Sequence, residues 1–349
     1  MSDKILHLVH NEKFIAPFID FVKDNNIKGK HTFLYFGGEP EEIYPIPDEE
    51  NIVIIYNEYN LLKKIVYLIR YLFITDKIIL HGLFNISVVK FLYYQPWLLK
   101  KCHWVMWGGD LYYHILAKDD ENYENIEKYR KKVIKGMGHL VTYIKGDYEL
   151  AQKWYGAKGE YHECFMYPSN LYKEYNIKPK EQNTTNIQVG NSADPTNNHL
   201  EVFEKLEKYK DEDIRVIVPL SQGDKEYAQE VIKKGKSIFD AKFEVLTDFI
   251  PFDEYLDLLA EVDIAIFNHN RQQAMGNTIT LLGLGKKVYM RTSVTPWNTF
   301  QNIGIKIFDV KNVILDLLDE EIKQQNQKRV KEYFSKENYL IQLNKLFES

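Results

Sequence analysis

Cysteine and long apolar runs are scarce in this sequence. The two cysteines, Cys102 and Cys164, offer no disulfide framework and suit a reducing compartment. No segment reaches the roughly 18 uninterrupted apolar residues that a membrane-spanning helix needs. The apolar run near Met1 is only about five residues long, too short for the core of a signal peptide. The sequence therefore argues against a secreted disulfide-rich domain and against an integral membrane protein, and it predicts a cytoplasmic location.

The fingerprints of several common sites are also missing. No G-x-G-x-x-G motif follows the first expected strand and no G-x-x-x-x-G-K-[ST] motif occurs, which excludes the usual dinucleotide and Walker-type sites. No Cys/His spacing suits zinc. The D-x-D triplet Asp211–Asp213 lies in a charged connection, which favours a solvated turn. The formal charge of −5 argues against nucleic acid as the main partner. We therefore expect no cofactor, no metal and no nucleic acid.

What is present is a regular alternation of β-branched runs and amphipathic segments. In the first half, the expected strands are Lys4–Val9, His31–Phe36, Asn51–Tyr56, Lys77–Leu80, His103–Trp107 and His139–Tyr143. The expected helices between them are Phe14–Lys23, Asn60–Phe73, Ile86–Tyr93, Tyr123–Lys135 and Asp147–Trp154. Strands that alternate with helices predict a parallel sheet covered on both faces.

The alternation resumes after a polar segment, Asn176–Asn186, where we place a domain boundary. The expected strands are then Ile187–Gly190, Ile214–Pro219, Phe243–Leu246, Asp263–Phe267 and Lys287–Met290. The expected helices are Asn198–Tyr209, Lys225–Ile238, Asp253–Ala260, Asn277–Leu284 and Glu320–Phe334. The predicted fold class is α/β, with two doubly wound, Rossmann-like domains that face each other across a cleft. They cover residues 1–175 and 187–318, and a helical segment, residues 319–349, follows.

One helix has two readings. Leu61–Ile74 is strongly apolar but contains Lys63, Lys64 and Arg70. It is either a buried crossover helix with a narrow wet face, or a basic, aromatic-rich helix that lies on an anionic membrane surface.

Ligands of open parallel sheets bind beyond the carboxyl ends of the strands, so the residues just after each strand are candidates. In the first half, Gly108 and Gly109 allow a sharp turn that points Asp110 off a strand end. Asp110 is the first candidate for a general base, and the alternative is a carboxylate that caps the next turn or helix. His10 and His81 also follow strands, and each is either a rival base or a structural histidine.

In the second half, two polar loops follow strands. One loop holds hydrogen-bond donors and cap residues, and the other gathers donors around Arg271 before a helix start. A helix N-terminus favours an anion, so we expect Arg271 and the nearby backbone amides to bind a diphosphate. The alternative is a plain helix cap with a turn. The candidate binding residues are Gly190, Asn191, Ser192, Asn197, Arg271, Gln272, Gln273, Gly276, Asn277 and Thr278.

These motifs carry a family resemblance. The segments HWVMWGGDLY, VGNSADPTNNH, VIVPLS and RQQAMGNTITLL are similar to the TDP-N-acetylfucosamine:lipid II N-acetylfucosaminyltransferases, also called 4-α-L-fucosyltransferases, and Phe243–Arg291 resembles the donor-binding half of GT-B glycosyltransferases. The resemblance implies a cytoplasmic enzyme, peripheral on the inner membrane, with its donor in the C-terminal domain and a lipid-linked glycan acceptor in the N-terminal one. It also implies that the binding residues hold the nucleotide diphosphate. Four residues would shape the reaction centre: Trp107, Gly108, Asp110 and Tyr112.

The leading hypothesis is therefore a glycosyltransferase that moves a deoxy or deoxyamino sugar from a nucleotide diphosphate, TDP-linked by resemblance, to a lipid-linked oligosaccharide in cell-surface polysaccharide synthesis. Two alternatives remain, because one fold hosts many activities. The first is a sugar-nucleotide epimerase or hydrolase. The second is a non-catalytic sugar-nucleotide-binding subunit.

Overall fold

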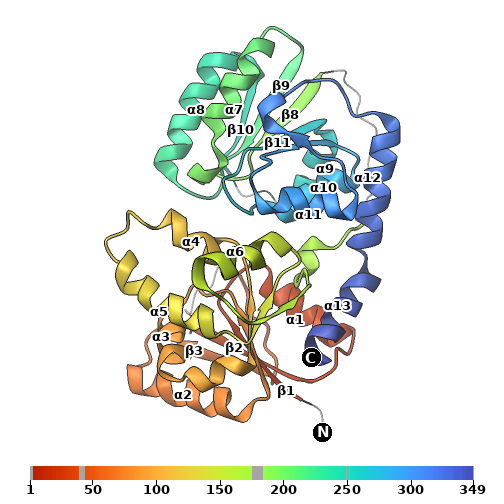
Figure 1. Ribbon diagram of the computed structural model, residues 1–349. Coiled ribbons are helices and arrows are strands. Elements are labelled where there is room, and N and C mark those ends of the chain that lie inside the picture. Colours follow the sequence, from red (N-terminus) through yellow and green to blue (C-terminus); the bar gives the residue numbers. More distant parts are fainter. Residues whose placement is uncertain (1–2, 39–43, 175–183, 249, 251, 349) are drawn as a thin grey trace. The chain divides into compact units, whose positions relative to one another are not determined.

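The computed structural model describes residues 3–38, 44–174, 184–248, 250 and 252–348. The chain divides into two compact units (Figure 1). The first unit comprises Met1–Ser169 with Glu337–Ser349, and the second comprises Asn170–Lys336. Each unit contains a sheet of parallel strands connected by helices, which confirms the predicted α/β class with two doubly wound domains.

The first unit has, within the described ranges, a seven-stranded sheet in the order β3-β2-β1-β4-β5-β6-β7. Its strands are β1 (Lys4–Val9), β2 (Lys30–Gly38), β3 (Ile52–Tyr56), β4 (Lys77–His81), β5 (Cys102–Val105), β6 (His139–Val141) and β7 (Glu160–His162). After β1 the chain builds one side of the sheet, and it then returns to place β4 against the other side of β1. The strand order thus reverses between β1 and β4, which is where such folds bind ligands.

The helices of the first unit are α1 (Ile15–Asp24), α2 (Leu61–Ile74), α3 (Ile86–Tyr94), α4 (Gly109–Leu116), α5 (Tyr123–Gly136), α6 (Lys145–Tyr155) and α13 (Lys336–Glu348). Asparagine side chains start two of them. Asn60 Oδ1 accepts from Lys63 N at 2.9 Å before α2, and Asn85 Oδ1 accepts from Ser87 N at 2.9 Å before α3. Each bond satisfies a backbone donor that a helix start leaves unpaired.

The second unit has, among its described residues, a six-stranded sheet in the order β10-β9-β8-β11-β12-β13. The strands are β8 (Thr185–Val189), β9 (Ile214–Pro219), β10 (Phe243–Leu246), β11 (Ile264–Phe267), β12 (Lys287–Met290) and β13 (Phe308–Asp309). The helices are α7 (His199–Leu206), α8 (Lys225–Phe239), α9 (Phe252–Glu261), α10 (Met275–Gly283), α11 (Thr295–Ile303) and α12 (Glu320–Tyr333). Helices α7 and α8 lie side by side (Figure 1). Here the strand order reverses between β8 and β11.

The unit boundaries differ from the expected ones. The chain passes from the first unit to the second at Ser169 and returns at Glu337, so the last helix belongs to the first unit. Helix α13 joins that unit because its apolar side chains are buried there. The Tyr339 ring lies 4.7 Å from the Phe21 ring of α1 and 4.9 Å from the Phe165 ring. Most of the expected linker, Asn176–Asn186, lies outside the described residues.

Several helices and strands were not predicted from the sequence. Strand β7 has three residues and β13 has two, too few to show a period. Helix α4 begins at Gly109, directly after Gly108 with a φ of 84°. Helix α11 also went unpredicted, whereas α13 lies within the helical segment expected over residues 319–349. Among the residues that the structure describes, no helix combines the length and the hydropathy needed to cross a membrane.

Candidate active site

The two polar loops of the second unit meet at the point where its strand order reverses. One loop follows β8 and the other follows β11, and these two strands are neighbours. Hydrogen bonds join the loops directly. Thr196 Oγ1 donates to Gln273 Oε1 at 2.9 Å, Gln273 Nε2 donates to Asn191 Oδ1 at 3.2 Å, and the backbone N of Asn270 donates to Thr196 O at 3.1 Å. The structure therefore brings together residues that the sequence separates by a series of strands and helices.

Arg271 forms an ion pair across the same junction. Its Nη2 lies 3.0 Å from Asp194 Oδ2, and its side chain is only 15% exposed. The Asp194 carboxylate is partly buried, but hydrogen bonds from Thr196 and the charge of Arg271 outweigh desolvation and lower its pKa. Asp194 thus holds the guanidinium in place at the loop junction, with a charge that an incoming anion would compete for.

Gly190 ends β8 in a conformation that suits glycine. Its φ is 66°, and a Cβ atom there would lie 2.4 Å from His199 Nε2 and 2.7 Å from Asn197 Oδ1. Asn197 is buried in this turn, where its Oδ1 accepts from Asn191 N at 3.0 Å and contacts His269 Nε2 at 2.9 Å. Asn197 therefore shapes the loop from within and does not cap α7, whose N-cap residue is Asn198.

The start of α10 faces the loop that contains Arg271. The helix begins at Met275, two residues before the expected Asn277, and its N-cap residue Ala274 has a φ of 56°. A methyl side chain cannot cap, so the first backbone N–H groups, including that of Gly276, remain available to a ligand. Within the described part of the chain, Gln272 Oε1 is buried without a hydrogen-bond partner.

Two residues of α10 that were expected to contact a ligand, Thr278 and Asn277, form hydrogen bonds within the protein instead. Thr278 is fully buried, and its Oγ1 donates to Ala274 O at 2.9 Å, so its hydroxyl belongs to the helix. Asn277 Nδ2 donates to Tyr255 Oη at 3.0 Å. Gln188 Nε2 also approaches this phenol, at 3.4 Å. Burial raises the pKa of Tyr255 to about 12. Asn277 thus holds Tyr255 at the side of the loop junction.

A pocket lies at the corresponding reversal in the first unit, between the carboxyl ends of β1 and β4. His10, His81, Gly82, Leu83 and Asn85 contribute to its lining. The His10 side chain is 30% exposed, and its ring lies 5.3 Å from the Trp107 ring. Burial lowers the pKa of His10, although the Asp110 charge opposes this effect. A neutral imidazole at the mouth of a pocket is suited to accept a proton.

Asp110 does not have the geometry expected of a general base. It is 1% exposed, and its two oxygens accept four hydrogen bonds. Oδ2 accepts from Trp104 Nε1 at 2.7 Å and Leu83 N at 3.0 Å, while Oδ1 accepts from Leu111 N at 2.9 Å and Trp107 N at 3.0 Å. The carboxylate therefore closes the turn around Gly108 and has little capacity left for a substrate proton.

His81 is likewise engaged on both sides of its ring. Its Nδ1 lies 2.7 Å from Tyr167 Oη and its Nε2 lies 3.0 Å from His7 Nδ1. Tyr167 Oη also accepts from Trp107 Nε1 at 2.8 Å. Burial lowers the pKa of His81 to about 3. The structure therefore does not support His81 as a base; its contacts fix Tyr167, which holds the indole of Trp107.

Sequence patterns did not predict several residues at these sites. Arg130 Nη1 donates to Leu83 O at 2.6 Å, and its Nη2 donates to Asp110 O, so it clamps the Asp110 turn from α5. Tyr112, expected at the reaction centre, is buried with its ring 5.5 Å from that of Trp154 on α6. For Asp194 a local signal existed, since an Asp before Pro is a usual helix cap. No local signal marks Arg130 or Tyr167.

The fold is that of the GT-B glycosyltransferases. The chain belongs to the 4-α-L-fucosyltransferase family, glycosyl transferase group 56, whose family model matches residues 7–345. This membership confirms the predicted family and enzyme class. It disfavours the alternative functions of a sugar-nucleotide epimerase or hydrolase and of a non-catalytic binding subunit.

Solved structures show the same fold at low sequence identity. Anabaena HepE, in complex with UDP and glucose, has a TM-score of 0.69 at 11% identity, with 99% of this chain and 98% of that chain covered. A glycosyltransferase from Rickettsia africae has a TM-score of 0.68 at 15% identity, with the same coverage. WaaG, a glycosyltransferase involved in lipopolysaccharide biosynthesis, has a TM-score of 0.55 at 10% identity, with 99% and 95% covered.

Proposed function

We propose that this enzyme transfers a deoxy or deoxyamino sugar from a TDP-linked donor to a lipid-linked glycan during cell-surface polysaccharide synthesis. The observation that carries the donor half is the junction of the two loops in the second unit. Arg271 lies beside the uncapped start of α10 there, so a cation and backbone N–H groups are both available to a diphosphate. The neighbour HepE was solved in complex with UDP and glucose and with UDP-glucose, which supports a nucleotide-linked donor.

The departing nucleotide diphosphate would be stabilised by the same groups. Charge builds up on the leaving phosphate as the glycosidic bond breaks, and donors that are already in place stabilise it without reorganisation. Asp194 would release Arg271 to the phosphate when the donor binds. Because fixed cations and amides supply this charge, we expect the transfer itself to need no metal.

We propose His10 as the group that removes the proton from the acceptor hydroxyl. Of the three candidate bases, His10 is the one whose side chain is partly exposed. Asp110 and His81 are 1% exposed. Both carboxylate oxygens of Asp110 and both ring nitrogens of His81 already have hydrogen-bond partners. The His10 ring packs beside those of Phe84 and Trp107, at centroid distances of 5.4 and 5.3 Å. Aromatic walls of this kind suit the apolar face of a sugar ring.

The donor site is tested by thermal unfolding with TDP, UDP, GDP, CDP and ADP on the wild type and on Arg271→Ala. A diphosphate at about 100 times its Kd stabilises the folded protein by roughly 2.7 kcal/mol, which raises Tm by several degrees. We expect TDP to give the largest shift with the wild type and a much smaller one with the variant, because the guanidinium contacts the phosphates.

Arg215→Ala is the matched control for this experiment. Arg215 lies near the amino end of β9, where it pairs with Glu244 and Glu261. Its loss removes the same charge from the same unit but leaves the loop junction intact, so the TDP-induced shift should persist. Equal TDP shifts in the wild type and Arg271→Ala would remove Arg271 from the donor site, and a larger shift with another diphosphate would replace TDP as the donor class.

We further propose that α2 places the enzyme on the inner face of the cytoplasmic membrane, where a lipid-linked acceptor resides. If α2 were a buried crossover helix, its apolar face would be covered, but only Leu68 and Leu72 of this helix are buried. Its exposed large apolar side chains are Leu61, Leu62, Val66, Ile69, Phe73 and Ile74. The basic residues Lys63 and Arg70 are exposed on the same helix. This combination suits the surface of an anionic bilayer.

Sedimentation with anionic vesicles tests this orientation. Changing Lys63, Lys64 and Arg70 together to Glu should weaken binding by at least about 10²-fold, because each basic residue near an anionic surface contributes roughly 1 kcal/mol. The control changes Lys233, Lys234 and Lys236 of α8 to Glu, which alters the net charge equally on an exposed helix of the second unit. Equal losses in both variants would point to net charge alone and contradict a specific role for α2.

A further inference from the structure

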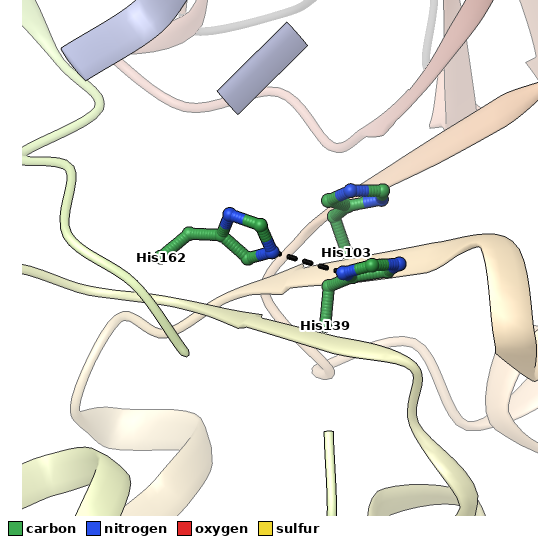
Figure 2. A group of neighbouring side chains, drawn as sticks. All are labelled: His103, His139 and His162. Carbon is green, nitrogen blue, oxygen red and sulfur yellow. Dashed lines mark hydrogen bonds between the residues drawn. The ribbon is translucent and has the colours of Figure 1, made fainter. Parts of the chain in front are cut away.

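Three histidines converge on one face of the first unit's sheet, at its edge (Figure 2). His103 of β5 is paired in register with His139 of β6, and His139 is paired with Glu160 of β7. Residues paired across parallel strands project from the same face, and so do residues two apart in one strand. Glu160 and His162 are two apart, so all four side chains stand on the same face of three adjacent strands.

The nitrogen atoms of the three rings lie close enough to share one cation. One ring nitrogen from each histidine lies within 4.8 Å of the others. His139 Nδ1 and His162 Nε2 are 2.9 Å apart (Figure 2). Glu160 Oε2 lies 3.7 Å from His139 Nδ1 and 4.0 Å from His162 Nε2. Three imidazoles and a carboxylate supply the ligand number and type that Zn²⁺ takes in tetrahedral sites.

The ring of His103 is already oriented as a ligand would be. Its Nδ1 must donate to Lys101 O, at 3.3 Å, because a carbonyl can only accept. In the neutral ring the lone pair is therefore on Nε2. Within the described residues this Nε2 is buried and has no hydrogen-bond partner. A ligating histidine usually donates its other N–H to a carbonyl or carboxylate in this way.

We propose that His103, His139, His162 and Glu160 bind one Zn²⁺ ion. Two ligand nitrogens of a tetrahedral Zn²⁺ lie about 3.3 Å apart, so His139 and His162 must separate by a few tenths of an ångström. The rings of His103 and His139 are stacked at 4.0 Å and 6°, so one of them must also tilt toward the ion. On binding, the hydrogen bond between His139 and His162 breaks, and the ring that donates it carries its proton on the other ring nitrogen instead. Both rings then coordinate as neutral imidazoles, and no oxidation or reduction takes place.

The charges around the cluster set its affinity. Lys77 and Lys345 stand near enough to lower the pKa of His162, and both therefore oppose a dication as well. Lys77 directs its ammonium to Phe347 O at 2.7 Å. Glu160 is the negative group at the cluster and offsets part of this repulsion. Its carboxylate is the ligand with the largest exposure, and it marks the side from which an ion can enter.

The ion would act on structure and not on sugar transfer. His103 and His139 lie in the amino-terminal half of their strands, whereas the predicted substrate pocket lies at the carboxyl ends of β1 and β4. Strand β7 is a three-residue edge strand, held on one side by β6. A metal bound across β5, β6 and β7 would fix this edge, from which the chain runs on to Tyr167.

The proposal is tested on the full chain after metal removal with a chelator, by titration with Zn²⁺ against a chromophoric competitor. We expect one Zn²⁺ per chain, a higher Tm on binding, and, with Co²⁺, the visible bands of a tetrahedral site. His103→Gln and His162→Gln should each weaken Zn²⁺ binding by at least about 10²-fold, and Glu160→Gln by about 10-fold, since even indirect partners of a metal site contribute 10- to 100-fold.

His114→Gln is the matched control, because His114 Nδ1 lies 2.9 Å from Glu127 Oε1 and forms another His–Glu pair of this unit, outside the cluster. Its Zn²⁺ affinity should equal that of the wild type. X-ray absorption at the zinc edge of the wild-type protein should show imidazole ligands even if a glutamine variant fails to fold. Absence of stoichiometric binding, binding that survives the loss of His103 and His162, or a spectrum without imidazoles would each overturn the proposal.

Discussion

Replacing Asp110 with asparagine is expected to destabilise the first unit by about 3–5 kcal/mol, because a buried carboxylate with four N–H partners is replaced by a group that cannot accept them all. The carboxylate accepts from Leu83, Trp104, Trp107 and Leu111. An asparagine NH₂ would face two of these donors with donors of its own. Thermal unfolding should show the midpoint of this unit lowered by roughly 10 °C.

His10→Gln is the comparison that separates a structural carboxylate from a base. The His10 ring is partly exposed at the pocket, so its replacement should change Tm little. Turnover should nevertheless fall by about 10²-fold, as expected for loss of a general base. If Asp110→Asn keeps the wild-type Tm and loses turnover, while His10→Gln remains active, the roles of the two residues are reversed.

Periodicity predicted the repeating parts of the fold. Ile214–Pro219, Phe243–Leu246 and Lys287–Met290 were expected as strands with the bounds that the structure gives them. Buried parallel strands are short continuous apolar runs between turn residues, and such runs are local signals. Helix α13 lies within the expected helical segment, but its place in the first unit was not predicted. What fixes it to the first unit is tertiary burial of Tyr339 and Phe347, which no local pattern contains.

In the candidate site, too, local patterns predicted some features, and features that depend on tertiary structure could not be predicted. Arg271 and Asn191 were predicted as ligand-binding residues because each follows a strand, and the structure places both loops at the reversal of strand order. The Thr278 amide, predicted to contact the diphosphate, instead donates to Ala274 O within the helix, as does its hydroxyl. The histidine–glutamate cluster could not be predicted from the sequence, because its members lie on three strands separated by crossover helices and match no zinc spacing rule.

The same sheet face carries a second group of histidines. In register, His7 pairs with Phe33 and Ile79, and Ile79 pairs with His103. His31 and His81 are each two residues from a member of this row. Six histidines therefore share one face: His7, His31, His81, His103, His139 and His162. Helix α13 contributes to the cover of this face through Phe347, whose ring lies 5.0 Å from that of His31.

Three of these rings form a directed hydrogen-bond chain. His31 Nε2 must donate to Lys28 O, at 3.0 Å, so its Nδ1 accepts from His7 Nε2 at 2.8 Å. His7 Nδ1 then accepts from His81 Nε2 at 3.0 Å, and His81 Nδ1 accepts from the Tyr167 hydroxyl. Every ring is neutral in this arrangement. A proton added to any of them would place two donors against each other.

The folded protein should therefore lose stability steeply as pH falls below about 6.5. Burial lowers the pKa of His81 to about 3, of His103 to about 2 and of His162 to about 4. Since these values lie below the unfolded value of 6.5, the unfolded chain binds more protons between pH 6.5 and about 4. Each such imidazole costs about 1.4 kcal/mol per pH unit in that window. Three of them cost about 4 kcal/mol per unit, a large part of the 5–15 kcal/mol that stabilises a typical domain. Above pH 7 these groups contribute no slope.

Urea unfolding at closely spaced pH values, with a chelator present to keep the histidine–glutamate cluster free of metal, measures the number of protons taken up. The variant with His103, His139 and His162 changed to Gln lacks three of the six imidazoles on this face. Its stability at pH 7.5 will differ from that of the wild type, but the informative quantity is the slope. Between pH 6 and 5 the variant should take up about two fewer protons on unfolding, because the imidazoles of His103 and His162 are charged in the unfolded chain and neutral in the folded one. Equal slopes for the two proteins would mean that these rings are protonated in the folded state, and the neutral histidine face would then be wrong.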